Sequence, residues 1–229
     1  MTSTSSFGAW GWGWGDDLAH GGWVTPTDIP AAEAAALKVL YYATNGDNWT
    51  DNTGWGTDPV ANNWYGVVVA GDKVTQINLN ANNLVGNVAA GFSLVTFTGL
   101  TRFYMYLNPS LTGDMSVWTL PASMQHYRVY GTGLSSFSPI SAALGIRSYY
   151  AYDCALSQAT VDAILLETYT NWAAFTYATP VLWIDGTNAA PSGIYQDGDP
   201  PTTGKEYAFE LENDPETTGN EVWDIKFTA

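Results

Sequence analysis

The chain has 229 residues, of which 46% are hydrophobic and only 13% are charged, so we expect one or two folded domains with a substantial core. Seven basic residues stand against 22 acidic ones, and the formal net charge of −15 predicts repulsion from nucleic acids and from anionic membranes. A single cysteine, Cys154, excludes an internal disulfide and a cysteine-based zinc site. No apolar run is long enough to predict a membrane span, and the N-terminus lacks the features of a secretory signal.

Residues 1–26 form a segment rich in glycine and tryptophan, in which Trp10, Trp12 and Trp14 alternate with glycines. In an extended strand this alternation places the three rings on one face. Because exposed tryptophans are unfavourable in water, we expect this segment to be an arm that docks on another subunit. Disorder is the alternative interpretation.

Residues 27–73 predict an N-terminal cap that begins with a helix over 28–43. Thr27 or Asp28 is the expected helix cap. The turn-rich stretch over 46–66 follows, and its aromatic side chains are expected to pack over the open end of the next element. They are Trp49, Trp55 and Trp64.

Residues 74–193 carry a repeat of the form L-x-x-L-x-L-x-x-N-x-L, with copies that start at 74, 100, 124 and 146 and a degenerate fifth copy. The fourth and sixth positions are expected to point inward from a short parallel strand, and stacking of the coils then forms one continuous core. The fitting residues are Val74, Ile77, Leu79, Asn82 and Leu84; Leu100, Phe103, Met105, Asn108 and Leu111; Met124, Tyr127, Val129, Thr132 and Leu134; Ile146, Tyr149, Ala151, Cys154 and Leu156; and Leu182, Ile184, Thr187 and Ala189.

The ninth position of each copy is expected to turn inward and bond to backbone groups at the corner of the coil. Asparagine occupies this position in the first two copies, and Thr132 is a weaker substitute in the third. Cys154 holds the position in the fourth copy, so this structural role explains the cysteine without a catalytic function. After the fourth copy, Ser157 predicts the cap of a helix that carries Val161, Ile164, Leu165 and Tyr169 on one side.

Residues 194–229 predict a C-terminal β segment with strands around 206–211 and 222–227. We expect this segment to cover the open end of the coils, because solenoids need caps and bare sheet edges favour aggregation. Acidic residues are frequent here, but their spacing fits no calcium-binding loop, so we interpret them as solvated surface charge.

The segment ALKVLYYATNGDNWTDNTGWGTDPVANNWYGVVVAGDKVTQINLNANNLVGNV, residues 36–88, resembles the N-terminal cap and first repeat of plant-type leucine-rich-repeat proteins and their bacterial and phage relatives. The resemblance is close over 36–88 and loose over 89–190. It implies an α/β leucine-rich-repeat solenoid with a parallel β-sheet on one face, and a function in binding proteins or glycans without catalysis. The plant cap contains a cysteine pair that this chain lacks, so aromatic packing is expected to replace it.

The C-terminal stretch from DGTNAAPSG to the end, residues 185–229, resembles the ends of tailed-phage virion proteins. This resemblance implies a component of the virion surface, with a bacterial cell surface or an extracellular location as the alternative. The arm that contains Trp10, Trp12 and Trp14 is then expected to contact other virion subunits.

The repeat predicts three columns of side chains on the exposed face of the sheet. The leading column is Gln76, Arg102, His126 and Ser148; the central column is Asn78, Tyr104, Arg128, Tyr150 and Trp183; and the trailing column is Asn80, Tyr106, Tyr130, Tyr152 and Asp185. Aromatic side chains with polar groups suit sugar rings and protein hot spots, and Arg102 and Arg128 favour an acidic ligand. Subunit contact and simple stabilisation of the sheet are the alternatives.

These observations favour a non-enzymatic decoration, fibre or adsorption protein that binds a glycan or a host surface protein through the sheet face. A purely structural virion subunit and a bacterial surface adhesin are the alternative hypotheses, and a homo-oligomer is left open. No cofactor and no metal site is expected. The two histidines, His20 and His126, lie in different segments, and His126 has Arg102 and Ser148 as neighbours, which is not a catalytic triad.

Overall fold

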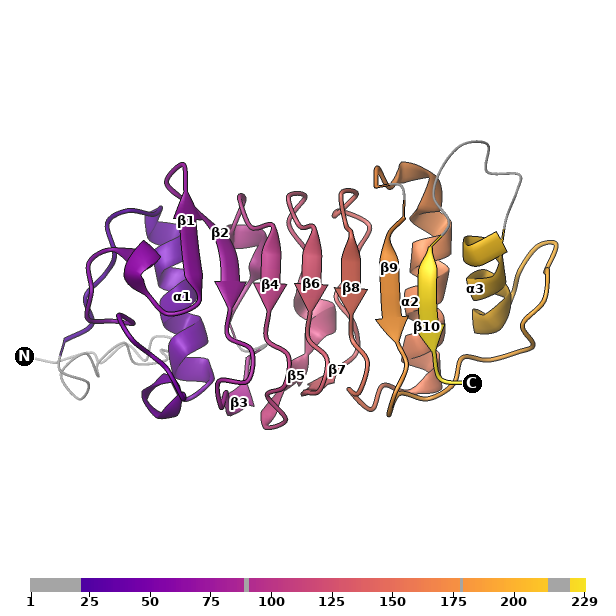
Figure 1. The fold of residues 1–229 in the computed structure, drawn as a ribbon, viewed down its shortest axis with the longest axis horizontal. Helices are drawn as coiled ribbons and strands as arrows, with labels where there is room; N and C mark the ends of the chain where they lie inside the picture. The colour runs from indigo at the N-terminus through magenta and orange to yellow at the C-terminus, as the bar shows by residue number, and fades with distance from the viewer. Residues whose placement is uncertain (1–21, 89–90, 178, 214–222) are drawn as a thin grey trace, which may run out of the picture.

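The computed structural model describes residues 22–88, 91–177, 179–213 and 223–229, so the predicted arm with Trp10, Trp12 and Trp14 lies outside the described residues. The fold is mixed α/β and is built on a mostly parallel seven-stranded sheet (Figure 1). The order of its strands is β1 (Val67–Ala70), β2 (Lys73–Asn78), β4 (Arg102–Tyr104), β6 (His126–Arg128), β8 (Ser148–Tyr150), β9 (Val181–Ile184) and β10 (Asp224–Phe227). Only β1 runs antiparallel to its neighbour.

The inward positions of the repeat form the core, as the sequence predicts. Each of the five parallel strands from β2 to β9, taken with the residue that follows it, contributes two fully buried side chains. Aromatic rings from neighbouring strands pack against each other in this core. The ring centroids of Phe103 and Tyr127 lie 5.8 Å apart, and those of Tyr127 and Tyr149 lie 5.0 Å apart. The buried pairs are Ile77 and Leu79, Phe103 and Met105, Tyr127 and Val129, Tyr149 and Ala151, and Leu182 and Ile184.

The corner asparagines connect consecutive strands through their side-chain amides. The Oδ1 of Asn108 accepts hydrogen bonds from the backbone N–H groups of Asn82 and Leu84, both at 3.0 Å. Its Nδ2 donates to the carbonyls of Leu79 at 2.9 Å and Met105 at 2.8 Å. The predicted role of this position is therefore confirmed.

The corner of the fifth copy is one residue later than the sequence pattern predicts. Asn188 is 2% exposed, and its Oδ1 accepts from the backbone N–H groups of Cys154 and Leu156 while its Nδ2 donates to the carbonyls of Ala151 and Ile184. The prediction of Thr187 at this corner is wrong, and Thr187 is exposed. One extra residue in the turn after β9 moves the inward position to the next side chain.

A second parallel sheet, which the sequence analysis did not anticipate, runs along the edge of the core. Its strands are β3 (Gly86–Asn87), β5 (Leu111–Asp114) and β7 (Gly133–Ser135). They follow the corners of the first three copies and bring the chain toward the return segments. Single turns of 3-10 helix complete the connections, at Gly46–Asn48, Ala61–Asn63, Leu94–Thr96, Met115–Val117 and Trp172–Ala174.

The N-terminal cap consists of α1 (Ala31–Ala43) and the turns that follow it, and α1 lies behind the N-terminal strands (Figure 1). Pro30 is the N-cap residue and no side chain caps the helix, so the predicted capping by Thr27 or Asp28 is wrong. The Asp28 carboxylate instead accepts hydrogen bonds from the N–H groups of Ala61 at 2.6 Å and Asn62 at 3.1 Å. It therefore connects the cap to its own later turns.

Aromatic rings fill the cap in place of a cysteine pair. Trp49, Trp55 and Trp64 are almost completely buried, as predicted. Ring centroids lie 4.9 Å apart for Trp49 and Trp55 and 5.0 Å apart for Trp55 and Trp64. Trp23, from the end of the segment expected to be an arm, packs edge-on against Trp64 at 5.5 Å. Aromatic burial therefore supplies the stability of this end.

The C-terminal third combines two helices with the last two strands. Helix α2 (Gln158–Asn171) lies behind β9 and β10, and the Ser157 side chain caps it by accepting from the N–H of Thr160 at 3.2 Å, as predicted (Figure 1). The predicted strand around 206–211 is wrong, because α3 (Gly204–Asn213) occupies this segment. The last strand is confirmed as β10, but it joins the main sheet in parallel with β9. Among the described residues, no helix is long and apolar enough to cross a membrane.

Candidate ligand-binding surface

The exposed side of the main sheet carries the three predicted columns in register. Arg102, His126 and Ser148 pair in sequence across β4, β6 and β8, and Tyr104, Arg128 and Tyr150 pair two residues further along the same strands. Trp183 on β9 pairs with Tyr150. The structure therefore brings together these residues of the leading and central columns on the side of the strands opposite to the core. The prediction that Ser148 is exposed there is wrong, because its side chain is buried beside His126.

The central column forms a continuous stack of aromatic and cationic groups. The guanidinium carbon of Arg128 lies 5.0 Å from the ring centroid of Tyr104 and 4.8 Å from that of Tyr150, so the cation is held between two rings. Tyr150 stacks on Trp183 at 4.5 Å with an angle of 6° between the planes. The Nζ of Lys226 lies 3.7 Å from the centroid of the Trp183 ring and continues the stack onto β10.

The trailing column is a ladder of stacked tyrosines. The centroids of Tyr106 and Tyr130 lie 4.5 Å apart with an angle of 10° between the planes, and those of Tyr130 and Tyr152 lie 4.1 Å apart with an angle of 14°. Parallel strands are spaced about 4.8 Å apart, which matches the stacking distance of flat rings. Asp185 follows β9 directly, and its carbonyl accepts a hydrogen bond from the N–H of Asp153, so it extends this column beyond Tyr152.

This stacking decides which part of each ring a ligand can reach. In the middle of both columns a ring has a neighbour on each face, as Tyr130 has in Tyr106 and Tyr152. A ligand therefore meets ring edges and hydroxyl groups rather than open ring faces. The expectation that these rings suit sugar stacking needs correction on this point, because stacking on a sugar requires a free face.

The leading column is polar and its centre is electropositive. The Nδ1 of His126 lies 2.9 Å from the Oγ of Ser148. Burial lowers the pKa of His126 below its usual value, and the positive charges of Arg128, Arg102 and Arg147 lower it further. His126 is therefore neutral at pH 7 and hydrogen-bonds Ser148.

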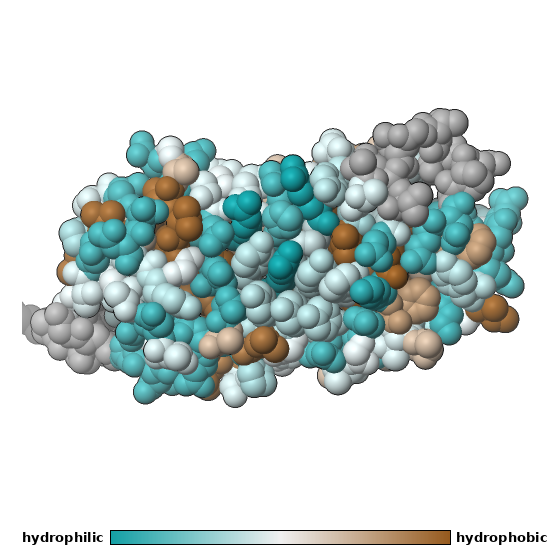
Figure 2. Space-filling view, in the orientation of Figure 1, coloured by the Kyte–Doolittle hydropathy of each residue, from teal (hydrophilic) through white to brown (hydrophobic). Residues whose placement is uncertain are grey.

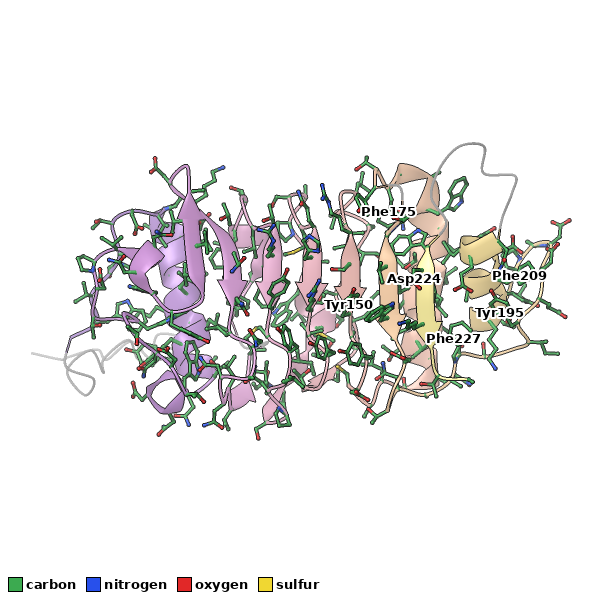
Figure 3. The ribbon with its side chains drawn as sticks, in the orientation of Figure 1. Tyr150, Phe175, Tyr195, Phe209, Asp224 and Phe227 are labelled. Carbon is green, nitrogen blue, oxygen red and sulfur yellow. The ribbon has the colours of Figure 1, made fainter. Side chains whose placement is uncertain are left out.

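Three contributors to this face escaped the sequence analysis. β10 adds Asp224 beside Val181 and Lys226 beside Trp183, and Figure 3 shows Tyr150 on the sheet face with Asp224 toward its C-terminal end. Arg147 lies just before β8, with its guanidinium carbon 4.8 Å from the ring centroid of Tyr177. The alternation of polar and apolar residues in WDIKF indicates the strand that forms β10. The position of β10 beside β9 depends on long-range packing, which the local sequence does not show.

In the part of the chain that the structure describes, no group of three or more His, Cys, Asp or Glu residues is arranged to hold a metal ion. Cys154 is buried, its Sγ lies 3.4 Å from the carbonyls of Val129 and Tyr152, and burial raises its pKa. A thiol with a raised pKa is a poor nucleophile, which fits its place at a corner of the core.

The buried tyrosines give the protein a specific alkaline sensitivity. Burial and the neighbouring Tyr152 raise the pKa of Tyr130 far above its usual value, and burial raises the pKa of Tyr127 and Tyr149. The unfolded chain ionises its tyrosines near pH 10, so these groups contribute their full stability below that pH and lose it as the pH rises. We expect the urea midpoint to fall once the pH exceeds 10, and an unchanged midpoint would contradict the burial of these hydroxyls.

No protein-family model matches this chain, and no solved structure matches it.

Proposed function

We propose that this chain is a non-enzymatic binding protein, a leucine-rich-repeat solenoid that takes up its ligand on the exposed face of the sheet. The observation that carries the proposal is the continuous row from Tyr104 through Arg128, Tyr150 and Trp183 to Lys226 on five adjacent strands. Tyrosine, tryptophan and arginine are the residues that dominate binding hot spots. The corner asparagines and the buried inward positions support the solenoid.

The proposed setting is the surface of a phage virion, where the chain serves as a decoration, fibre or adsorption component and binds a glycan or a host surface protein. The resemblance of residues 185–229 to virion proteins supports this setting. The segment with Trp10, Trp12 and Trp14 then anchors the protein to other subunits. A bacterial surface adhesin is the alternative setting, and the neighbouring genes distinguish the two.

The second candidate function is a purely structural subunit whose sheet face is covered in the assembly. The mutual stacking of Tyr106, Tyr130 and Tyr152 favours it, because such a ladder stabilises the sheet without any ligand. On this hypothesis the purified protein binds no glycan or host protein, and its columns are buried against a second subunit.

The test is a binding screen against glycans and host surface proteins with the wild type and a Tyr150→Ala/Trp183→Ala variant. We expect the variant to lose binding by about tenfold or more, because each removed ring contributes at a hot spot. Tyr65→Ala is the control, since Tyr65 is exposed in the cap outside the columns. Equal binding by the wild type and the double variant would contradict the proposal.

A second variant separates loss of binding from loss of folding. Tyr106→Phe/Tyr130→Phe/Tyr152→Phe keeps the stacked rings and removes only the hydroxyl groups. Because the ring faces are covered by their neighbours, the hydroxyls are the polar groups that this column offers a ligand. We expect weaker binding with an unchanged far-ultraviolet circular dichroism spectrum.

A further inference from the structure

All three arginines of the chain lie on or directly before neighbouring strands of the main sheet, although the protein carries a net charge of −15. Arg102 is on β4, Arg128 is on β6, and Arg147 immediately precedes β8. The charges of all three act on His126, which pairs with Arg102 across the two strands. Neighbouring strands are about 4.8 Å apart, so the three residues form one cluster, which we call the arginine cluster.

Among the described residues, the contacts of Arg128 and Arg147 are with aromatic rings rather than with carboxylates. Arg128 lies between the rings of Tyr104 and Tyr150, and Arg147 lies over the ring of Tyr177. Within the described ranges, no ion pair joins any of the three arginines to an aspartate or glutamate. In an acidic chain, arginines that form no ion pair within the described residues indicate a site for an external anion.

The environment of Arg128 strengthens this interpretation. Two rings cover the faces of its planar guanidinium, and its Nε is buried without a hydrogen-bond partner. A guanidinium held in this way keeps little rotational freedom and offers its N–H edge, which matches a carboxylate or a sulfate. Aromatic ring edges carry partial positive charge, so the edges of the stacked tyrosines also favour an anion.

The surface around the cluster distinguishes a glycan from a protein as the ligand. Protein interfaces bury an apolar centre inside a polar rim. The exposed large hydrophobic side chains, such as Leu107, Val117 and Ile194, lie outside the three columns. Figure 2 shows the middle of the sheet face as mostly pale to teal, with brown patches toward its N-terminal end, along its lower edge and right of its centre. Hydroxyl, amide and guanidinium groups without an apolar centre suit a hydroxyl-rich polymer.

Acidic residues border the positive zone on one side. Asp185 and Asp224 lie at the C-terminal end of the face; burial raises the pKa of the nearby Tyr150, Arg128 opposes this, and the charge of Asp224 adds to it. The arginines therefore lie on or next to the strands from β4 to β8, while Lys226 on β10 lies among these acidic residues. A folded acidic protein would meet the whole negative surface, whereas a single polysaccharide chain meets only this strip.

We infer that the arginine cluster binds the carboxylate or sulfate groups of an acidic polysaccharide that lies across the strands from β4 to β8. The inference rests on the proposed function of the sheet face and names the class of its ligand. It predicts that charge on the polymer, rather than the identity of the sugar, controls recognition at this point.

The test uses two pairs of polymers that differ only in charge: polygalacturonate with its methyl ester, and dextran sulfate with dextran. We expect the wild type to bind an anionic member and to ignore its neutral partner, with affinity that falls as salt is added. Arg102→Gln should weaken this binding by at least about tenfold, because a charged hydrogen bond is lost. Arg102 is exposed, so this variant should fold normally.

Lys205→Gln is the matched control, since it removes the same charge from α3, away from the sheet face. It should leave binding unchanged. Binding of the neutral polymers as tightly as the anionic ones, no binding of either anionic polymer, or equal effects of the two variants would overturn the inference. If a neutral glycan or a protein is bound instead, and the Tyr150→Ala/Trp183→Ala variant loses it, the proposed function stands while the inference fails.

Discussion

Replacement of Asn108 by alanine is expected to destabilise the fold by at least about 3 kcal/mol. The amide of Asn108 is fully buried and satisfies four backbone groups, the N–H groups of Asn82 and Leu84 and the carbonyls of Leu79 and Met105. Alanine leaves these four groups without partners in the core, and each buried unsatisfied group costs about 1–3 kcal/mol. Relaxation and entering water would recover only part of this loss.

The measurement is the free energy of unfolding in urea for Asn108→Ala beside Asn80→Ala. Asn80 lies in the trailing column and is half-buried, so it serves as a control for the loss of an asparagine outside the core. We expect the control to change stability by less than about 1 kcal/mol. A similarly small loss for Asn108→Ala would mean that the corner amide does not support the stacked coils.

Replacement of Gly66 by alanine should be as damaging, for a steric reason. Gly66 has a φ of +77°, and an added Cβ would lie 2.1 Å from the backbone oxygen of Asn78. That oxygen belongs to β2 and cannot move without breaking the junction between the cap and the sheet, where the N–H of Asn78 donates to the carbonyl of Gly66 at 2.7 Å. We expect a loss of at least about 3 kcal/mol.

Gly71 provides the matched control for this prediction. Its φ is +57°, so alanine meets a similar backbone penalty there of about 1–2 kcal/mol, but nothing lies within 4 Å of the added Cβ. The difference between the two thermal midpoints isolates the steric clash. Equal midpoints for Gly66→Ala and Gly71→Ala would show that the cap does not approach β2 as the structure has it.

The repeated part of the fold could be predicted because it depends on local spacing. Inward residues such as Ile77 and Leu79 keep the same spacing within each copy, and in the first two copies the corner asparagine follows at a fixed distance. The fifth copy failed because a single extra residue moved the corner from Thr187 to Asn188. Sequence spacing alone does not locate such an insertion, since both side chains are polar and adjacent.

The segment that became α3 was misread because its apolar residues alternate. Tyr207, Phe209 and Leu211 resemble one face of a strand, but the helix buries Ala208 and Leu211 instead. The side chain of Glu206 accepts hydrogen bonds from the N–H groups of Thr202 and Thr203 and fixes the start of the helix. Figure 3 shows Tyr195, Phe209 and Phe227 grouped beside α3, which is a tertiary contact that no local pattern contains.

The residues that form the columns of the candidate site could be predicted, because the register of the strands follows from the repeat. Their chemistry was not, since the stacking of Tyr130 between Tyr106 and Tyr152 depends on side-chain rotamers. The contribution of Lys226 depends on β10, which reaches its place only after the chain has passed through α3. The sequence therefore located the face, while the structure identified edges, hydroxyls and cations as its available groups.

The most direct test of the account is a comparison of ligand binding by the wild type, Tyr150→Ala/Trp183→Ala and Tyr65→Ala, with each protein first shown to be folded. The account predicts that a ligand found with the wild type is retained by Tyr65→Ala and lost by the sheet-face variant. Retention of that ligand by all three proteins would place its site elsewhere. Failure of the wild type to bind any glycan or host protein would contradict the proposed function and favour a structural subunit with a covered sheet face.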